Sequence, residues 1–146
     1  AASQIEEFYL LIEKDKLYKY DKIAINVIVN NKKGGINSCD IAFNEDLTQF
    51  VKDYTQLTQR TSQENKSNFL EDYMIIGTSA MIDTELDSIV TQYTDKFTNP
   101  MLMWGKYRKH LFKTLLPISF QFHHSQMDGG HGAKFLELLQ KEIKKA

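Results

Sequence analysis

The chain has 146 residues, of which 42% are hydrophobic and 25% charged, and its formal net charge is −1. This length fits a single domain. The proportions of hydrophobic and charged residues are usual for globular proteins, so extensive disorder is excluded. A net charge close to zero argues against a protein that binds the phosphate backbone of nucleic acids. No apolar run reaches the ~20 residues that a membrane span needs, so we expect no membrane contact.

Cysteine usage favours a reducing compartment. Cys39 is the single cysteine of the chain, which excludes an internal disulfide. The first residues, Ala1 to Gln4, contain neither the basic nor the apolar part of a secretion signal. We therefore predict a cytoplasmic protein with Cys39 as an inert buried thiol.

The first part of the chain predicts extended structure. Residues 8–13 are apolar and β-prone, residues 14–16 form a turn, and residues 17–20 resume the extended pattern. Residues 23–29 are rich in β-branched side chains and predict a strand. A Lys-Lys-Gly-Gly loop then leads to a second extended stretch at residues 36–43.

Residues 44–60 predict the first helix. Asn44 is the expected N-cap, and the two acids that follow it suit the positive first turn of a helix. Apolar residues recur on one face at helical spacing. They are Leu47, Phe50, Val51, Tyr54 and Leu57. A polar loop is expected at residues 61–67.

The next segments are shorter. Residues 73–76 predict a strand that ends at Gly77-Thr78-Ser79-Ala80. Residues 83–93 have mixed polarity, which fits either extended structure or a loop. Residues 100–104 predict a strand and residues 105–110 a turn.

A strand at residues 114–122 and a helix at residues 132–145 complete the chain. The buried stripe of that helix is predicted to be Phe135, Leu136, Leu139 and Ile143. Strands alternate with two helices, and the sequence contains neither a repeat nor a linker. We predict one domain over residues 1–146 with an α/β (α+β) fold, in which helices pack on a mixed β-sheet.

The most informative stretch is His-His-Ser-Gln-Met-Asp-Gly at residues 123–129, between the last strand and the last helix. A histidine fixed at a strand end can serve as a general base near neutral pH, since free imidazole has a pKa of ~6.5. The stretch resembles the HHxxxDG signature of CoA-dependent acyltransferases.

Flanking residues make the resemblance more specific. Asn-Pro-Met-Leu-Met-Trp-Gly-Lys-Tyr at residues 99–107 and Leu-Leu-Pro-Ile-Ser-Phe-Gln-Phe at residues 115–122 resemble conserved segments of chloramphenicol acetyltransferases. Asp-Gly-Gly-His with the following Phe-Leu-Glu-Leu-Leu-Gln at residues 128–140 is similar to the family's last helix. The resemblance covers essentially the whole chain and is strongest from Pro100 onward. By length and motif position, Ala1 matches a point about 65–70 residues into family members.

The resemblance implies a chemistry and assigns residues to it. His124, the second histidine, would be the general base, and Ser79 would stabilise the oxyanion. Asp128 would be a structural residue whose arginine partner lies in the part of the family sequence that this chain does not match. The cosubstrate would be acetyl-CoA, the acceptor a small molecule with a hydroxyl group, and the assembly a homotrimer with sites between subunits.

The residues at the acceptor-pocket positions differ from the family pattern more than the residues at the catalytic positions do. Ile36 replaces an aromatic residue that packs on chloramphenicol, and Met103 replaces a threonine. Met81 and Ile82 replace the Pro-Trp pair that usually follows the serine. We therefore take Ile36 and Met103 as the predicted acceptor contacts.

The predicted function is an acetyl-CoA-dependent O-acetyltransferase that modifies a hydroxyl of chloramphenicol or a related small molecule, which implies antibiotic resistance. Two alternatives stay open. One is a dihydrolipoamide-type acyltransferase, against which the Gly-Lys-Tyr turn at residues 105–107 speaks. The other is a truncated or degenerate, inactive relative that binds a ligand or its own copies.

Other readings of the motif are weaker. His123, His124, Asp128 and His131 lack the defined spacing of a zinc site, so we predict no metal. Gly129 and Gly130 lack the Gly-x-x-x-x-Gly-Lys-Ser/Thr pattern of a phosphate loop, and turn geometry is the expected reason for both glycines.

Overall fold

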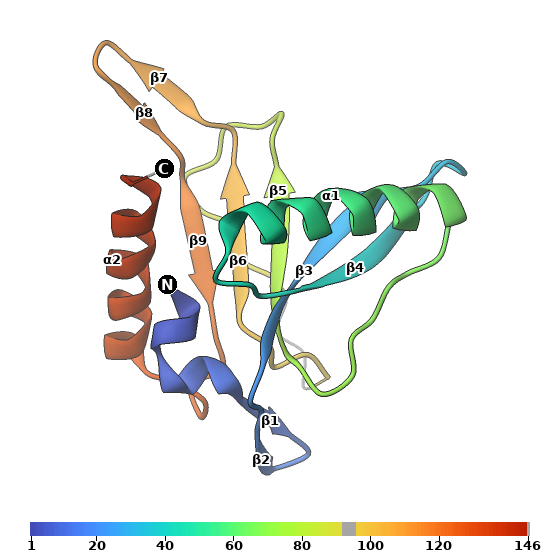
Figure 1. The fold of residues 1–146 in the computed structure, drawn as a ribbon. Helices are drawn as coiled ribbons and strands as arrows, with labels where there is room; N and C mark the ends of the chain where they lie inside the picture. Colours follow the sequence, from blue (N-terminus) through green and yellow to red (C-terminus); the bar gives the residue numbers. More distant parts are fainter. Residues whose placement is uncertain (92–95, 146) are drawn as a thin grey trace.

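The computed structural model describes residues 1–91 and 96–145 (Figure 1). Its centre is a five-stranded sheet in the order β4-β3-β5-β6-β9. The strands are β3 (Ile23–Asn30), β4 (Ile36–Ala42), β5 (Met74–Met81), β6 (Met101–Gly105) and β9 (Ile118–Gln121). β3, β5 and β6 are parallel, whereas β4 and β9 pair antiparallel with their neighbours. The mixed sheet predicted from the sequence is thus confirmed.

Two α-helices and several short elements surround the sheet. They are α1 (Leu47–Glu64), α2 (Gly129–Ile143), the 3-10 turns η1 (Ala2–Gln4) and η2 (Glu6–Tyr9), and the hairpin strands β1 (Leu10–Glu13), β2 (Lys16–Lys19), β7 (Arg108–His110) and β8 (Lys113–Leu115). The β7–β8 hairpin projects away from the sheet (Figure 1). Of the undecided stretch at residues 83–93, residues 83–91 form turns, bends and irregular structure, and residues 92 and 93 lie outside the described part.

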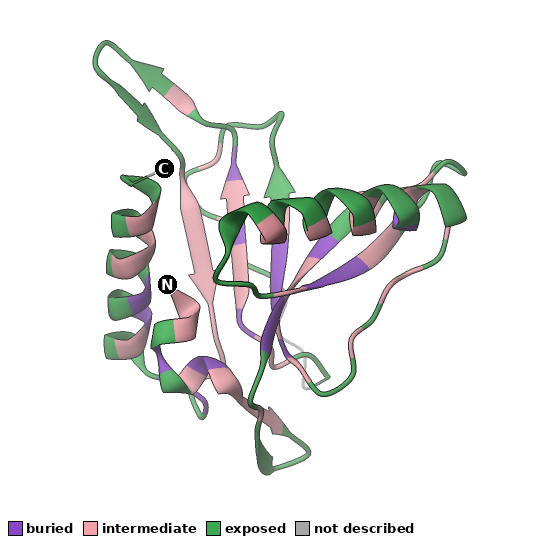
Figure 2. Cartoon of the chain, viewed as in Figure 1, coloured by how far each residue is buried: buried purple, intermediate pink, exposed green. Residues whose placement is uncertain are grey.

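Both α-helices cover the same face of the sheet. Partner residues in neighbouring strands share a face, and Ile25 of β3 pairs with Ile76 of β5. Ile25 contacts the cluster that α1 covers, and Ile76 belongs to the cluster that α2 covers. Figure 2 shows that buried residues lie on the central strands and on α2. The α1 cluster consists of Val27, Cys39 and Ile41 with Phe50 and Leu57 against it. The α2 cluster consists of Ile5, Phe8, Ile76, Met127 and Phe135.

The opposite face carries a row of three residues from neighbouring strands. Ser79 of β5 pairs with Met103 of β6, and Met103 pairs with Ser119 of β9. The chain that follows β5 returns across this face, because the N–H of Ile89 donates to Oγ of Ser119 at 2.7 Å. This face therefore holds the predicted oxyanion donor and one predicted acceptor contact.

The first helix differs from its prediction at both ends. Its N-cap is Asp46 rather than Asn44, because Oδ1 of Asp46 accepts from the N–H groups of Thr48 and Gln49. The helix continues into the first part of the predicted polar loop and ends at Glu64, and its C-cap Asn65 has the left-handed φ of 54° that closes many helices. Part of the predicted stripe is exposed, namely Leu47, Val51 and Tyr54, because α1 covers only the β3–β4 side of the sheet.

The predicted strand at residues 114–122 is divided in two. β8 pairs with β7 in the projecting hairpin, whereas β9 pairs with β6 in the main sheet. Pro117 lies at the division. Its carbonyl oxygen accepts from the N–H of Gly105 at 3.3 Å, and a proline cannot donate a ladder hydrogen bond in return.

The second helix begins at Gly129, three residues before its predicted start. Gly129 and Gly130 are therefore helical residues, and the turn assigned to them was wrong. In the described residues, Gly34 is the only glycine with positive φ. The predicted stripe is confirmed for Phe135, which is buried, and for Leu139, which packs against the α2 cluster, but it is wrong for Leu136 and Ile143, which are exposed.

We expect Gly132→Ala to destabilise the protein by ~1–3 kcal/mol, because an added Cβ overpacks a fixed contact. That Cβ would lie 2.9 Å from Cε1 of Phe122, whose ring packs against Phe120. Urea unfolding measures the loss. The control is Gly129→Ala, where a Cβ meets nothing within 4 Å and alanine favours the helix. Equal unfolding midpoints for the two variants would contradict the packing argument.

Candidate active site

His124 lies in a turn between β9 and α2. The N–H groups of Gln126 and Met127 donate to the carbonyl oxygen of His123 at 2.9 and 3.2 Å, and the N–H of Ser125 donates to Nδ1 of His123 at 3.3 Å. Met127 anchors the turn because its side chain is buried in the α2 cluster. The His124 side chain is exposed. The turn thus places this imidazole beyond a strand end, where it is accessible from solvent.

Asp128 is the N-cap of α2. Its Oδ1 accepts from the N–H of His131 at 3.1 Å, and the N–H of Asp128 donates to Nδ1 of His131 at 3.2 Å, which completes a capping box. The hydrogen bond from the His131 N–H is the main reason why the pKa of Asp128 lies below its ordinary value. The helix terminus and His131 therefore supply partners for this carboxylate within the chain.

His131 extends this network to the N-terminal part of the chain. Its Nε2 lies 3.1 Å from Oε1 of Glu7 in η2, and its Nδ1 lies 2.9 Å from Oδ1 of Asp128. The sequence reasoning considered His131 only for a metal. The sequence did contain a signal of a capping role: His131 follows three residues after Asp128, and Asp128 precedes the predicted helix.

Ser79 lies near the carboxyl end of β5 and is half-buried. It lines a hollow of about 660 Å³, to which Tyr54 of α1 and Trp104 of β6 also contribute. Thr78, the residue before it, is tied to the neighbouring strand because its Oγ1 donates to the carbonyl oxygen of Asn26 at 2.7 Å. The serine hydroxyl is thus carried by a fixed strand at the edge of an open hollow.

The two predicted acceptor contacts have different surroundings. Ile36 is 67% exposed and lines the same hollow as Ser79. Met103 is 1% exposed and is enclosed by the chain's own atoms, so its role as an acceptor contact stays a prediction. Met81 and Ile82, the residues that depart from the family pattern after the serine, are exposed and also line the hollow.

Within one chain, Ser79 and His124 lie at opposite ends of the sheet. Ser79 is level with Ser119 of β9 through Met103. His124 follows five residues after Ser119, past the end of β9, which runs opposite to β5 and β6 (Figure 1). At ~3.3 Å of rise per strand residue, β9 alone adds about 7 Å between that level and its end at Gln121. A single chain therefore does not bring the two side chains together.

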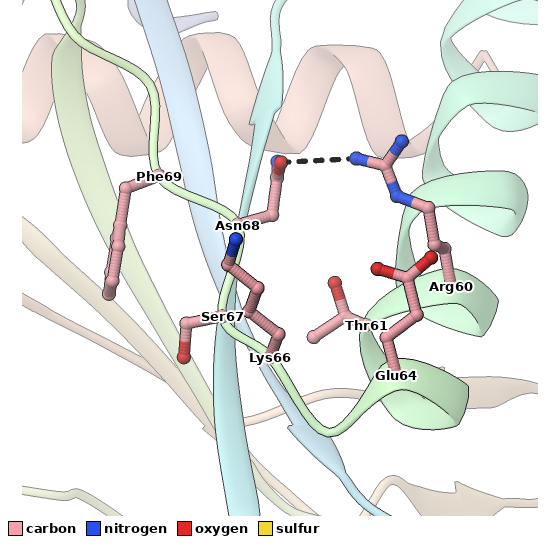
Figure 3. A pocket seen from close by; sticks show the side chains of 7 residues that line it. All are labelled: Arg60, Thr61, Glu64, Lys66, Ser67, Asn68 and Phe69. Atoms are coloured by element: carbon pink, nitrogen blue, oxygen red, sulfur yellow. Dashed lines mark hydrogen bonds between the residues drawn. The ribbon is translucent and has the colours of Figure 1, made fainter.

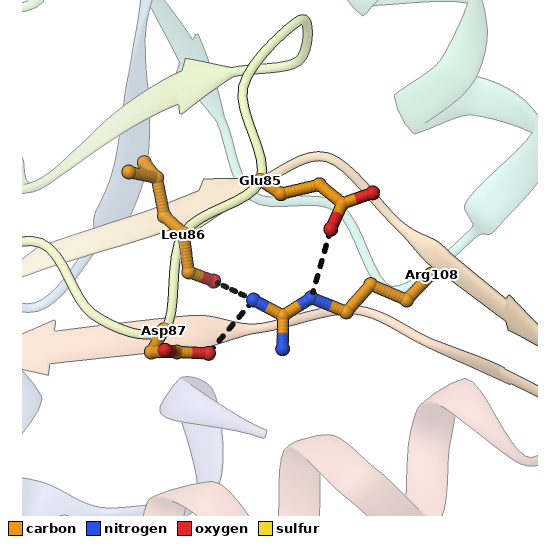
Figure 4. Close-up of polar contacts among 4 residues, drawn as sticks. All are labelled: Glu85, Leu86, Asp87 and Arg108. Carbon is orange, nitrogen blue, oxygen red and sulfur yellow. Dashed lines mark hydrogen bonds and ion pairs between the residues drawn. The ribbon is translucent and has the colours of Figure 1, made fainter.

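Arg108 makes contacts that the sequence did not predict. Its Nη2 donates to Oδ1 of Asp87 at 2.7 Å and to the carbonyl oxygen of Leu86 at 3.0 Å, and its Nε lies 3.9 Å from Oε2 of Glu85 (Figure 4). These contacts connect the projecting hairpin to residues 85–87, which belong to the segment that crosses the sheet face carrying Ser79. The available signal was the set of basic residues Lys106, Arg108 and Lys109 and the acids Glu85 and Asp87.

A second hollow, of about 480 Å³, lies between the end of α1 and residues 66–69. Arg60 reaches across it to Asn68, with 3.3 Å between Nη2 and Oδ1 (Figure 3). Thr61 is buried at this place. Cys39 is buried as predicted, and burial raises the pKa of its thiol, which agrees with an inert role.

Neither a metal cluster nor a membrane helix is found in residues 1–91 and 96–145. These residues contain no group of three His, Cys, Asp or Glu side chains arranged to hold a metal ion. None of their helices is long and apolar enough to cross a bilayer.

Comparisons with known proteins agree on one family. The family described as chloramphenicol acetyltransferase matches residues 1–140. Chloramphenicol acetyltransferase 3 of Escherichia coli is 26% identical over 147 residues, which cover 97% of this chain and 68% of that protein. The chain thus spans about two thirds of this relative.

Solved structures support the same fold. A chloramphenicol acetyltransferase superposes with a TM-score of 0.74 at 24% identity, over 93% of this chain and 69% of that chain. The dihydrolipoamide acetyltransferase of Azotobacter vinelandii superposes with a TM-score of 0.69 at 15% identity, over 93% and 60% of the two chains. At these identities the superpositions establish the fold, and the family match over residues 1–140 establishes the membership. The chain belongs to the chloramphenicol acetyltransferase family of acyltransferases.

Proposed function

We propose that the chain is an acetyl-CoA-dependent O-acetyltransferase in which His124 is the general base and Ser79 the oxyanion donor. The observation that carries the proposal is an exposed imidazole, held in the HHxxxDG turn at a strand end, in a chain of this family. The acceptor is a small molecule with a hydroxyl group, such as chloramphenicol or a related compound. Acetylation of such a drug would give antibiotic resistance.

The proposed reaction needs no covalent intermediate on the protein. A nitrogen of His124 takes the proton of the acceptor hydroxyl while the oxygen attacks the thioester carbonyl of acetyl-CoA. The negative charge on the carbonyl oxygen is stabilised by the hydroxyl of Ser79, which donates a hydrogen bond. The carbon–sulfur bond then breaks, and the imidazolium returns the proton to the leaving thiolate. The products are the acetyl ester and free CoA.

We further propose that each site forms between two copies of the chain in a homotrimer. The separation of Ser79 and His124 within one chain supports this, since the chemistry needs both groups around one thioester. Ser79 would act from the hollow of one copy, and His124 would come from the exposed turn of its neighbour. A closed cyclic trimer repeats the same contact three times, so every site would be complete.

A mixture of two inactive variants is expected to regain activity if sites form between copies. Ser79→Ala alone should lower turnover by ~10²–10³-fold through loss of the oxyanion donor, and His124→Ala removes the base. In co-refolded equimolar trimers, about one quarter of the interfaces combine an intact Ser79 with an intact His124. Thiol release from acetyl-CoA, with chloramphenicol among the acceptors, should therefore recover to about one quarter of the wild-type rate. Failure to exceed the sum of the separate variants would argue against a shared site.

Dihydrolipoamide acyltransferase activity is a second candidate function, because a dihydrolipoamide acetyltransferase superposes with a TM-score of 0.69. In that reaction the acceptor is a thiol of dihydrolipoamide, and the same histidine would remove its proton. Comparing turnover with dihydrolipoamide and with hydroxylated acceptors decides between the two. Higher turnover with dihydrolipoamide would replace our proposal.

The hypothesis that the chain is an inactive relative is tested by calorimetry with CoA. Binding of CoA without turnover on any acceptor would support a binding protein, whereas turnover that depends on His124 excludes it. The predicted cytoplasmic location rests on the single cysteine and stays a prediction.

A further inference from the structure

His131 contacts two carboxylates from separate elements. Its two ring nitrogens lie 3.1 Å from Oε1 of Glu7 in η2 and 2.9 Å from Oδ1 of Asp128 before α2. All three side chains are partly exposed, but the Glu7 carboxylate and the His131 ring retain only 28% and 36% of their side-chain exposure. The capping box involves only Asp128 and His131, so the contact with Glu7 is additional to the helix cap.

The imidazole suits this position in either protonation state. When both nitrogens carry hydrogen, one N–H donates to Glu7 and the other to Asp128, and the positive ring separates two negative groups. When Nδ1 is bare, it accepts the backbone N–H of Asp128 at 3.2 Å, while Nε2–H still donates to Glu7. His131 therefore links η2 to the N-terminus of α2 under both conditions.

This link bears directly on the turn that carries His124. Asp128 ends that turn and lies four residues after His124. The chain's two arginines are held elsewhere, Arg60 at Asn68 and Arg108 at Asp87. His131 is thus the side chain whose ring nitrogen the structure places against the carboxylate of Asp128.

We propose that His131 is a positioning residue: by joining Glu7 to Asp128 it fixes the turn at residues 123–128 and so the ring of His124. The inference rests on the proposed function for its catalytic consequence. Its structural part, the ordering of the turn by the Glu7–His131–Asp128 bridge, is independent of any reaction.

The test uses His131→Gln and Glu7→Ala in the full chain. Glutamine is a usual partner in a capping box, so His131→Gln keeps the helix cap and loses the contact between the imidazole and Glu7. Because small displacements of a catalytic group cost up to ~10²-fold in rate, we expect turnover to fall roughly 10–100-fold. The KM values for acetyl-CoA and acceptor and the midpoint of urea unfolding should stay at wild-type values.

The two changes should also be non-additive. If both break one bridge, the double variant loses no more turnover than the stronger single variant. His110→Gln, on the exposed projecting hairpin, is the matched control and should leave turnover unchanged. Additive losses, or a loss of turnover matched by a lower unfolding midpoint, would overturn the positioning role.

Hydrogen exchange supplies a readout that needs no activity. The amides of Gln126 and Met127, which donate to His123 within the turn, should exchange faster in both variants than in the wild type. If the wild-type protein transfers no acetyl group, the proposed function fails, and faster exchange still supports the bridge. Unchanged exchange in both variants overturns the inference whatever the activity, as does wild-type turnover of both variants in an active enzyme.

Discussion

Replacing His124 with alanine is expected to lower acetyl transfer by ~10²–10⁴-fold, the usual contribution of a general base. The acceptor hydroxyl would then lose its proton only to water, while the hollow around Ser79 would remain. Because the His124 side chain is exposed, its removal leaves no cavity and should not change the midpoint of urea unfolding. Thiol release from acetyl-CoA with a panel of hydroxylated acceptors measures the effect.

The control for this variant is His110→Ala, which removes a second exposed histidine on the β7–β8 hairpin. It should retain wild-type turnover, which would show that the loss in His124→Ala is specific to that position and does not follow from removing any exposed histidine. The assignment of His124 fails if His124→Ala transfers acetyl groups at the wild-type rate. It also fails if His110→Ala loses as much turnover as His124→Ala.

Phe8→Ala is expected to cost ~3–5 kcal/mol of unfolding free energy, the range for truncating a buried phenylalanine. Phe8 is 0% exposed, and its ring centroid lies 4.8 Å from that of Phe135 and 5.6 Å from that of Phe120. The side chain thus joins η2 to α2 and to β9. Since small domains have a total stability of ~5–15 kcal/mol, urea unfolding should show a large shift of the midpoint.

The matched control is Phe112→Ala at the tip of the projecting hairpin, where the phenylalanine is 95% exposed. Its effect should stay within about 0.5 kcal/mol, as for most surface substitutions. A midpoint for Phe8→Ala as high as that of Phe112→Ala would mean that the α2 cluster contributes little to stability.

Local signals predicted the elements that depend on local sequence. The β-branched run at residues 23–29 lies within β3 (Ile23–Asn30), and the stretch at residues 100–104 nearly coincides with β6 (Met101–Gly105). Errors arose where two signals competed. Asn44 and Asp46 are both good caps, and the structure uses Asp46 because its oxygen reaches two amide groups of the first turn.

Errors of a second kind arose where partners far apart in sequence decide the structure. The run at residues 114–122 is uniformly extended, but its halves pair with different strands, β7 and β6. The exposure of Leu47, Val51 and Tyr54 on α1 likewise follows from how little of the sheet that helix covers. Hydrophobic periodicity says which face of a helix is apolar, not how much of that face finds a partner.

The family and its acyltransferase class could be read from the linear order of residues, because motifs record side-chain identity and spacing. The same motifs led to the predictions for His124 and Ser79. The partners of those residues could not be read in this way. Strand order and direction put Ser79 and His124 at opposite ends of one sheet, and the packing of η2 against α2 brought Glu7 to His131, 124 positions along the chain. Contacts over such sequence distances depend on how the whole chain closes on its core, which is a property of the three-dimensional packing and leaves no local pattern.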